Sequence, residues 1–135
     1  GVRPEWVEAD VLDLRYSAEF DLVTCFGALG HILPADQERF LRVVFDALKP
    51  GGQFILVSSP HPSAFSLRSL ALRTFNGVMR LRNAALKPPF IMYYLTFLLP
   101  ELKQSLERTG FEVEVRAGQF ERPFQHYQLV IATRP

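Results

Sequence analysis

One stretch, residues 20–58, limits what this chain can fold into, because it reads as strand, helix and strand in succession. Residues 20–26 are mostly apolar and β-prone. We expect a helix over residues 35–48, whose apolar side chains repeat at three- and four-residue spacing before a Lys-Pro-Gly-Gly stop. Residues 54–57 are continuously apolar, which is typical of a strand covered on both faces. Together these elements predict a parallel α/β sheet.

The end of the chain predicts a helix followed by an antiparallel hairpin. Pro100 suits the first turn of a helix, and Gly110 is a typical C-terminal cap. Residues 111–117 alternate between apolar and charged side chains, so we expect a strand with one wet face. Residues 126–133 alternate less cleanly, which indicates a more central strand that pairs with the first through the loop 118–125.

Charge and composition exclude several classes of protein. The 135 residues fit one domain, and a formal net charge of +1 argues against a strongly basic nucleic-acid binder. The single cysteine favours a reducing compartment, and we expect a cytoplasmic protein. No signal sequence opens the chain, and no apolar run reaches the roughly 18 residues of a membrane span.

The middle segment, residues 60–98, differs from the rest. From His61 to Pro100 there is no acidic residue, and the apolar content is high. We expect two helical pieces, interrupted near residues 76–77 and by the prolines at 88–89. Three interpretations remain open: a lid over a greasy acceptor, a helical cap that only fills core, or a basic amphipathic surface that meets anionic lipid.

Four motifs, taken in order and with their spacing, carry a family resemblance. They are Glu-Ala-Asp-Val-Leu-Asp-Leu at 8–14, Phe-Asp-Leu-Val at 20–23, Gly-His-Ile-Leu at 30–33 and Leu-Lys-Pro-Gly-Gly at 48–52. This series resembles the second half of a class I S-adenosylmethionine-dependent methyltransferase, most closely the small-molecule branch known as type 11. The helix that ends at Gly110 and the closing hairpin resemble the C-terminal end of that family.

The resemblance implies a Rossmann-like sheet in the order 3-2-1-4-5-7-6, with strand 7 antiparallel. Strands 3 to 7 of the family would correspond, in number order, to residues 6–9, 20–26, 53–58, 111–117 and 126–133. Strands 1 and 2 have no counterpart here, nor has the glycine-rich cofactor loop. We therefore expect one partial domain over residues 1–135, most simply through loss of an N-terminal piece. Strand 4 would then expose an apolar edge, through which two copies could dimerise.

By the same resemblance, five residues would bind S-adenosylmethionine. The carboxylate of Asp10 would accept a hydrogen bond from the adenine amine, and the Val11 amide would donate one to a ring nitrogen. The alternatives for Asp10 are a solvated turn or a helix cap, and Asp13 is the competing carboxylate. Cys25, Phe26 and Gly27 would line the cofactor cleft after strand 4. Phe26 departs from the polar residue often found there, and core packing is its alternative role.

No catalytic base is clear from the sequence. His31 and His61 are weak candidates: the first more often stabilises its loop, and the second follows strand 5 at the cleft rim. The two histidines have no metal-ligand spacing, so we expect no metal site. A nucleophilic role for Cys25 is disfavoured, because no basic residue adjoins it. Methyl transfer does not require a base if donor and acceptor are well aligned.

Two functions of different classes follow. The first is methyl transfer from S-adenosylmethionine to a small molecule, which can be lipophilic, by the intact protein, with this chain inactive alone. The second is a non-catalytic, methyltransferase-like module that pairs through its open sheet edge. A third hypothesis, a nucleotide-dependent oxidoreductase, has less support than either, because the glycine-rich motif that binds the nucleotide in such enzymes is also missing. Neither reading requires nucleic acid, and membrane contact through residues 60–98 is the less favoured interpretation of that segment.

Overall fold

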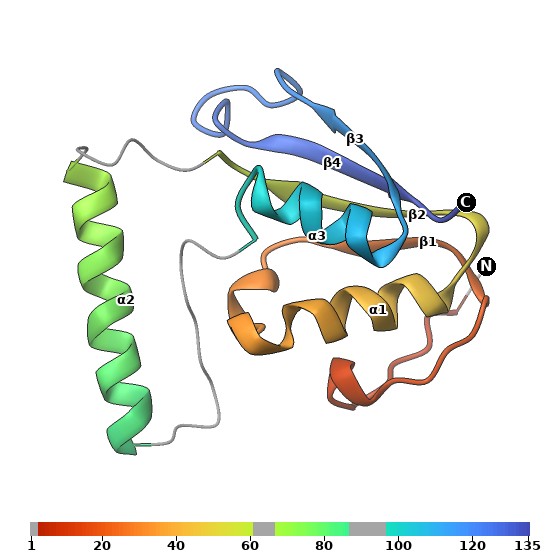
Figure 1. Ribbon diagram of the computed structural model, residues 1–135, viewed down its shortest axis with the longest axis horizontal. Helices are drawn as coiled ribbons and strands as arrows, with labels where there is room; N and C mark the ends of the chain where they lie inside the picture. Colours follow the sequence, from red (N-terminus) through yellow and green to blue (C-terminus); the bar gives the residue numbers. More distant parts are fainter. Residues whose placement is uncertain (1–2, 61–66, 87–96) are drawn as a thin grey trace.

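A computed structural model describes residues 3–60, 67–86 and 97–135. The strands form one sheet in the order β1-β2-β4-β3 (Figure 1). Their bounds are β1 Phe20–Cys25, β2 Leu48–Ser58, β3 Glu112–Arg116 and β4 Gln128–Thr133. β1 runs parallel to β2, and β4 is antiparallel to both β2 and β3. The order 4-5-7-6 and the antiparallel strand 7 implied by the resemblance are therefore confirmed.

Two of the helices, α1 and α3, lie on one face of this sheet, and α2 lies beyond one end of it (Figure 1). The α-helices are α1 Gln37–Ala47, α2 Leu67–Leu86 and α3 Glu101–Thr109. Short 3-10 helices are η1 Val11–Asp13, η2 Leu29–His31 and η3 Pro34–Asp36. α3 ends as expected, because Gly110 adopts a φ of 114° and its N–H donates to the carbonyls of Leu106 and Glu107.

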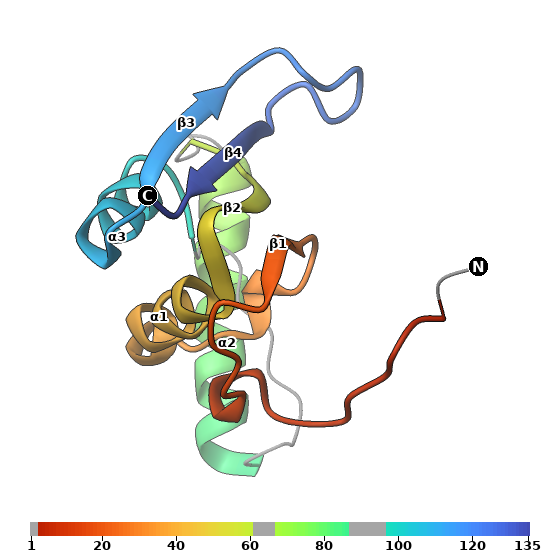
Figure 2. The ribbon, with the colours of Figure 1, turned by 90° about the vertical axis from the view of Figure 1, so that its right-hand side faces the viewer.

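The core lies between the sheet and the pair α1 and α3, which cover the same face (Figure 2). Phe54 and Leu56 of β2 are fully buried there. The prediction that this strand is covered on both faces is wrong for the described residues, because Ile55 and Val57 stay partly exposed on the other side. Leu22 of β1 is 52% exposed. The apolar run 54–57 therefore includes residues on a sheet face that no described element covers.

The segment before β1 is not a strand. Residues 6–9 lie outside any strand, and Trp6 is 90% exposed. The prediction of a strand here is therefore wrong. The physical reason is that a β-strand needs a neighbour to accept and donate its ladder of hydrogen bonds, and no described strand lies beside this segment.

The Lys-Pro-Gly-Gly stop is confirmed, but it becomes part of β2. α1 ends at Ala47 and β2 begins at Leu48, five residues earlier than the predicted start at 53. The register with β1 shifts between Phe20 and Leu22, which absorbs the extra residues as a bulge. A Cβ on Gly52 would lie 2.8 Å from the Lys49 carbonyl oxygen, so glycine is required at this close approach.

α2 is one continuous helix across Asn76 and Gly77, where we expected an interruption. A single glycine costs a helix only about 1 kcal/mol relative to alanine, which a helix of this length tolerates. The second predicted interruption, at residues 88–89, lies outside the described residues. None of the helices described here combines the length and the apolar character that a membrane span requires.

Candidate cofactor site

The carboxyl ends of β1 and β2 define one edge of the sheet. Cys25 pairs with Leu56 in a parallel register, so both strands end on the same side (Figure 1). Ligands in open α/β sheets bind beyond this edge, where the loops after the strands meet. The candidate site therefore begins with the loop after β1.

The loop after β1 holds two of the predicted cofactor residues, Phe26 and Gly27. Phe26 is 59% exposed, so it does not serve as a core residue. Gly27 has a φ of 77°, and a Cβ there would meet nothing within 4 Å. Open space beside a glycine backbone allows a ligand to approach closely. The loop therefore offers an exposed ring and an accessible backbone at the ligand edge of the sheet.

Cys25 lies at the end of β1 and is half-buried. Burial raises the pKa of its thiol above the ordinary value of 9.0, and a hydrogen bond with the Ala28 backbone opposes this only in part. The thiol is the form that burial favours, whereas nucleophilic attack needs the thiolate. The side chain packs against the core as a small apolar group.

Asp10 is the N-cap of η1. Its Oδ1 accepts a hydrogen bond from the backbone N–H of Leu12 at 2.9 Å, and the residue is exposed. The Val11 N–H opens η1, where the first N–H groups of a helix have no acceptor inside the helix. One carboxylate oxygen and one N–H in adjacent residues can accept from and donate to the same planar ligand edge. The cap role and the binding role are therefore compatible.

Asp13, the competing carboxylate, is engaged. Its Oδ1 lies 2.9 Å from a guanidinium nitrogen of Arg39, which also donates to the Leu12 carbonyl at 3.1 Å. Arg39 thus holds η1 against α1. Arg39 could not be found from the sequence, because it lies 26 positions from Asp13 and no local spacing indicates the pair.

The two halves of the site pack against a common core. Val11, Leu12 and Cys25 are partly buried hydrophobic residues that contact the same core cluster. η1 also contacts α1, whose first turn follows the loop after β1 through η2 and η3. The segment that holds Asp10 and the loop that holds Phe26 are therefore both fixed to the same hydrophobic core.

The candidate bases are less well placed. His31 is half-buried at the end of η2, and its backbone N–H donates to the Ala28 carbonyl at 3.0 Å, which supports the loop itself. His61 lies outside the described residues. Within residues 3–60, 67–86 and 97–135, no group of three or more His, Cys, Asp or Glu residues is arranged so that it could hold a metal ion.

Comparison with known proteins adds independent evidence. A family model described as a methyltransferase domain matches residues 1–52. Solved structures match nearly the whole chain, and the fold of the chain is that of the class I S-adenosylmethionine-dependent methyltransferases. No curated protein matches it.

Three structures with this methyltransferase fold show the extent of the likeness. An O-methyltransferase family protein from Burkholderia thailandensis has a TM-score of 0.64 and 17% identity over 96% of this chain and 35% of its own. A 1,6-didemethyltoxoflavin-N1-methyltransferase from the same organism, with its substrate and S-adenosylhomocysteine bound, has 0.58 and 18% over 95% and 49%. A methyltransferase from Methanosarcina mazei has 0.57 and 19% over 93% and 65%. The chain thus spans about a third to two thirds of these proteins.

Proposed function

We propose that the protein to which this chain belongs transfers a methyl group from S-adenosylmethionine to a small molecule, which can be lipophilic. The observations that support the proposal are the exposed Asp10 cap beside the Val11 amide, and the open Gly27 loop at the carboxyl edge of the sheet. When bound, the cofactor supplies a methyl group that is activated by its sulfonium. We also propose that this protein is located in the cytoplasm.

The donor set fits the adenine half of the cofactor. The second carboxylate oxygen of Asp10 would accept from the exocyclic amine, and the Val11 N–H would donate to a ring nitrogen. The exposed Phe26 ring would cover the apolar part of the purine, and Gly27 would let the ligand approach the backbone. No residues of this chain correspond to the glycine-rich loop and the ribose carboxylate. We therefore infer that this chain alone binds the cofactor weakly and is inactive.

The protein's own contribution to the reaction would be alignment. An in-line displacement at well-positioned groups gains on the order of 7–11 kcal/mol from proximity and orientation. Neither His31 nor His61 is needed as a base if the acceptor is already nucleophilic. Within the segment 60–98, α2 follows the carboxyl end of β2 in the chain, which supports a lid role for this segment within a single partial domain.

The test is a titration of the isotope-labelled 135-residue chain with S-adenosylhomocysteine, followed through the amide resonances. We expect millimolar binding that shifts Val11 and Gly27. Asp10→Asn keeps an oxygen for the cap but points its amide nitrogen at the adenine amine, so two donors oppose each other. Because a hydrogen bond to a charged group contributes about 1.5–3 kcal/mol, binding should weaken roughly tenfold or more. Asp13→Asn is the matched control and should retain binding.

Three results would count against this proposal. The first is a set of shifts that avoids Val11 and Gly27, and the second is an equal loss in the Asp13→Asn control. The third is micromolar affinity by calorimetry, which would contradict the inference that half of the pocket lies outside this chain.

A second candidate function has its own supporting observation. β1 is an edge strand, and its Phe20 and Leu22 are exposed beside the uncovered sheet face. Such an edge can pair with another chain, so a non-catalytic module that pairs through β1 is the alternative. Sedimentation velocity over a range of concentrations tests it. Concentration-dependent association that Leu22→Lys abolishes, together with no cofactor-induced shifts, would favour the alternative.

A further inference from the structure

α2 carries positive charge that no acidic residue of its own offsets. Its 20 residues include four arginines and neither Asp nor Glu: Arg68, Arg73, Arg80 and Arg82. The whole chain has a net charge of only +1, so the positive charge is concentrated in this helix. A local concentration of this kind favours an anionic partner.

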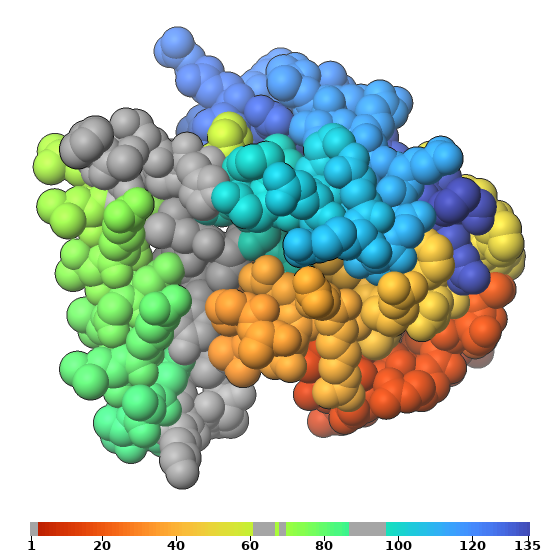
Figure 3. Space-filling model, in the orientation of Figure 1, coloured from red at the N-terminus to blue at the C-terminus, as the bar shows by residue number. Residues whose placement is uncertain are grey.

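The same helix exposes an apolar stripe. Leu67, Leu70, Val78 and Leu81 are 86%, 63%, 55% and 74% exposed. At 3.6 residues per turn these four lie within one side of the helix. The half-buried residues lie on the opposite side: Leu72, Asn76, Met79 and Asn83. The apolar stripe therefore faces away from the covered side of α2, which forms a ridge at one end of the molecule (Figure 3).

The arginines flank this stripe. On the helical wheel, Arg73 and Arg80 lie on one border of the exposed apolar side, and Arg82 lies on the other. All three side chains are exposed. Long cationic side chains beside an apolar strip can extend their charged ends to the phosphates while the strip enters the acyl boundary.

We propose that α2 docks flat on an anionic lipid surface, with the Leu67–Leu81 stripe at the boundary between headgroups and acyl chains. Electrostatic attraction and apolar burial act together in this geometry. The helix lies on the surface and does not cross it, because four arginines over its length oppose burial in the hydrocarbon core. The proposal does not depend on the methyltransferase function.

Charge and exposure distinguish this occupant from two others. A second copy of α2 would bring four arginines against four with no carboxylate of the helix between them, which is repulsive. Nucleic acid would use the arginines but would leave the apolar stripe in water. Anionic lipid, unlike these two, satisfies both features at once.

Flotation of the full chain with vesicles tests the electrostatic part. We expect binding to phosphatidylcholine vesicles that contain phosphatidylglycerol, and little binding to pure phosphatidylcholine. Each arginine near the surface contributes about fivefold to partitioning, so R73Q/R80Q should bind roughly 25-fold less tightly. Higher salt should weaken binding. The matched control R3Q/R122Q removes the same charge elsewhere and should bind as the parent does.

Fluorescence tests the apolar part. Trp6 is the only tryptophan, so the W6F background allows a single probe. W6F/L81W should shift to the blue with phosphatidylglycerol vesicles, whereas W6F/F124W, a probe in the exposed loop between β3 and β4, should not. Equal binding to both vesicle types, no binding, an equal loss in R3Q/R122Q, or an unshifted probe at position 81 would overturn the proposal. Self-association without flotation would assign the face to a second copy.

Discussion

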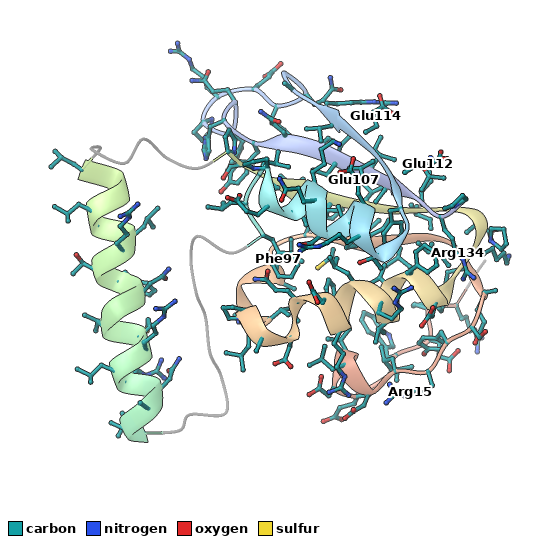
Figure 4. The ribbon with its side chains drawn as sticks, in the orientation of Figure 1. Arg15, Phe97, Glu107, Glu112, Glu114 and Arg134 are labelled. Atoms are coloured by element: carbon teal, nitrogen blue, oxygen red, sulfur yellow. The ribbon has the colours of Figure 1, made fainter. Side chains whose placement is uncertain are left out.

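Arg134 offers the sharpest test of how the sheet is fixed to α1. It follows β4, and its Nη1 donates to the carbonyls of Phe45, Asp46 and Leu48 at 3.0, 3.2 and 2.6 Å (Figure 4). The guanidinium carbon also lies 4.8 Å from the centre of the Phe45 ring. These contacts satisfy carbonyls at the C-terminal end of the helix, where positive charge is favourable.

Arg134→Met should destabilise the chain by about 2 kcal/mol. A hydrogen bond from a charged group contributes about 1.5–3 kcal/mol, and we take the lower part of that range because the side chain is partly exposed. Urea unfolding measures the change. With a slope of about 2 kcal/mol per molar, the midpoint should fall by about 1 M.

Two further variants separate the parts of this effect. Arg134→Lys keeps the charge but loses the planar fork, so it should recover only part of the stability. Arg122→Met removes an exposed arginine in the loop between β3 and β4 and should change stability by less than about 0.5 kcal/mol. The reasoning is refuted if Arg134→Met stays within that margin, or if Arg122→Met costs as much.

Other predictions concern the carboxyl edge. The Ser58 hydroxyl donates to the buried Phe97 carbonyl, so Ser58→Ala should cost about 1–3 kcal/mol in urea unfolding, whereas Ser59→Ala should cost clearly less. Equal costs would show that the hydroxyl contact is unimportant. Folding raises the pKa of the Cys25 thiol, so the folded state holds this proton more tightly than the unfolded state does. The resulting contribution to the free energy of unfolding is present below pH 9.0 and is lost as the pH rises through the folded pKa. Stability should therefore fall more steeply above pH 9.0 than in Cys25→Ser, and parallel pH profiles of the two would contradict this.

The sequence predicted the parts of the fold that local patterns determine. The alternation over 111–117 and the glycine at 110 indicated β3 and the end of α3, and both are confirmed. A strand at 6–9 could not be judged locally, because it depends on a neighbour that the described chain does not provide. Likewise, the apolar run 54–57 indicates that both faces of the strand are apolar, but it does not indicate which element covers each face.

The candidate site was predicted through resemblance rather than spacing. The sequence placed Asp10 at the end of a strand, which is wrong, and the structure shows the alternative, a helix cap. The Arg39 ion pair that engages Asp13 was beyond local reasoning. The role of Asp10 in binding stays a prediction. The exposed stripe of α2 also required the structure, because sequence periodicity does not distinguish an outer apolar face from an inner one.

The most direct measurement is an isotope-filtered NOE experiment on the labelled chain with S-adenosylhomocysteine. Adenine protons should show contacts with the Val11 methyl groups and the Phe26 ring, and Asp10→Asn should remove them. Adenine contacts with the uncovered sheet face, at Leu22 or Val57, would contradict the account. So would a complex that survives Asp10→Asn unchanged.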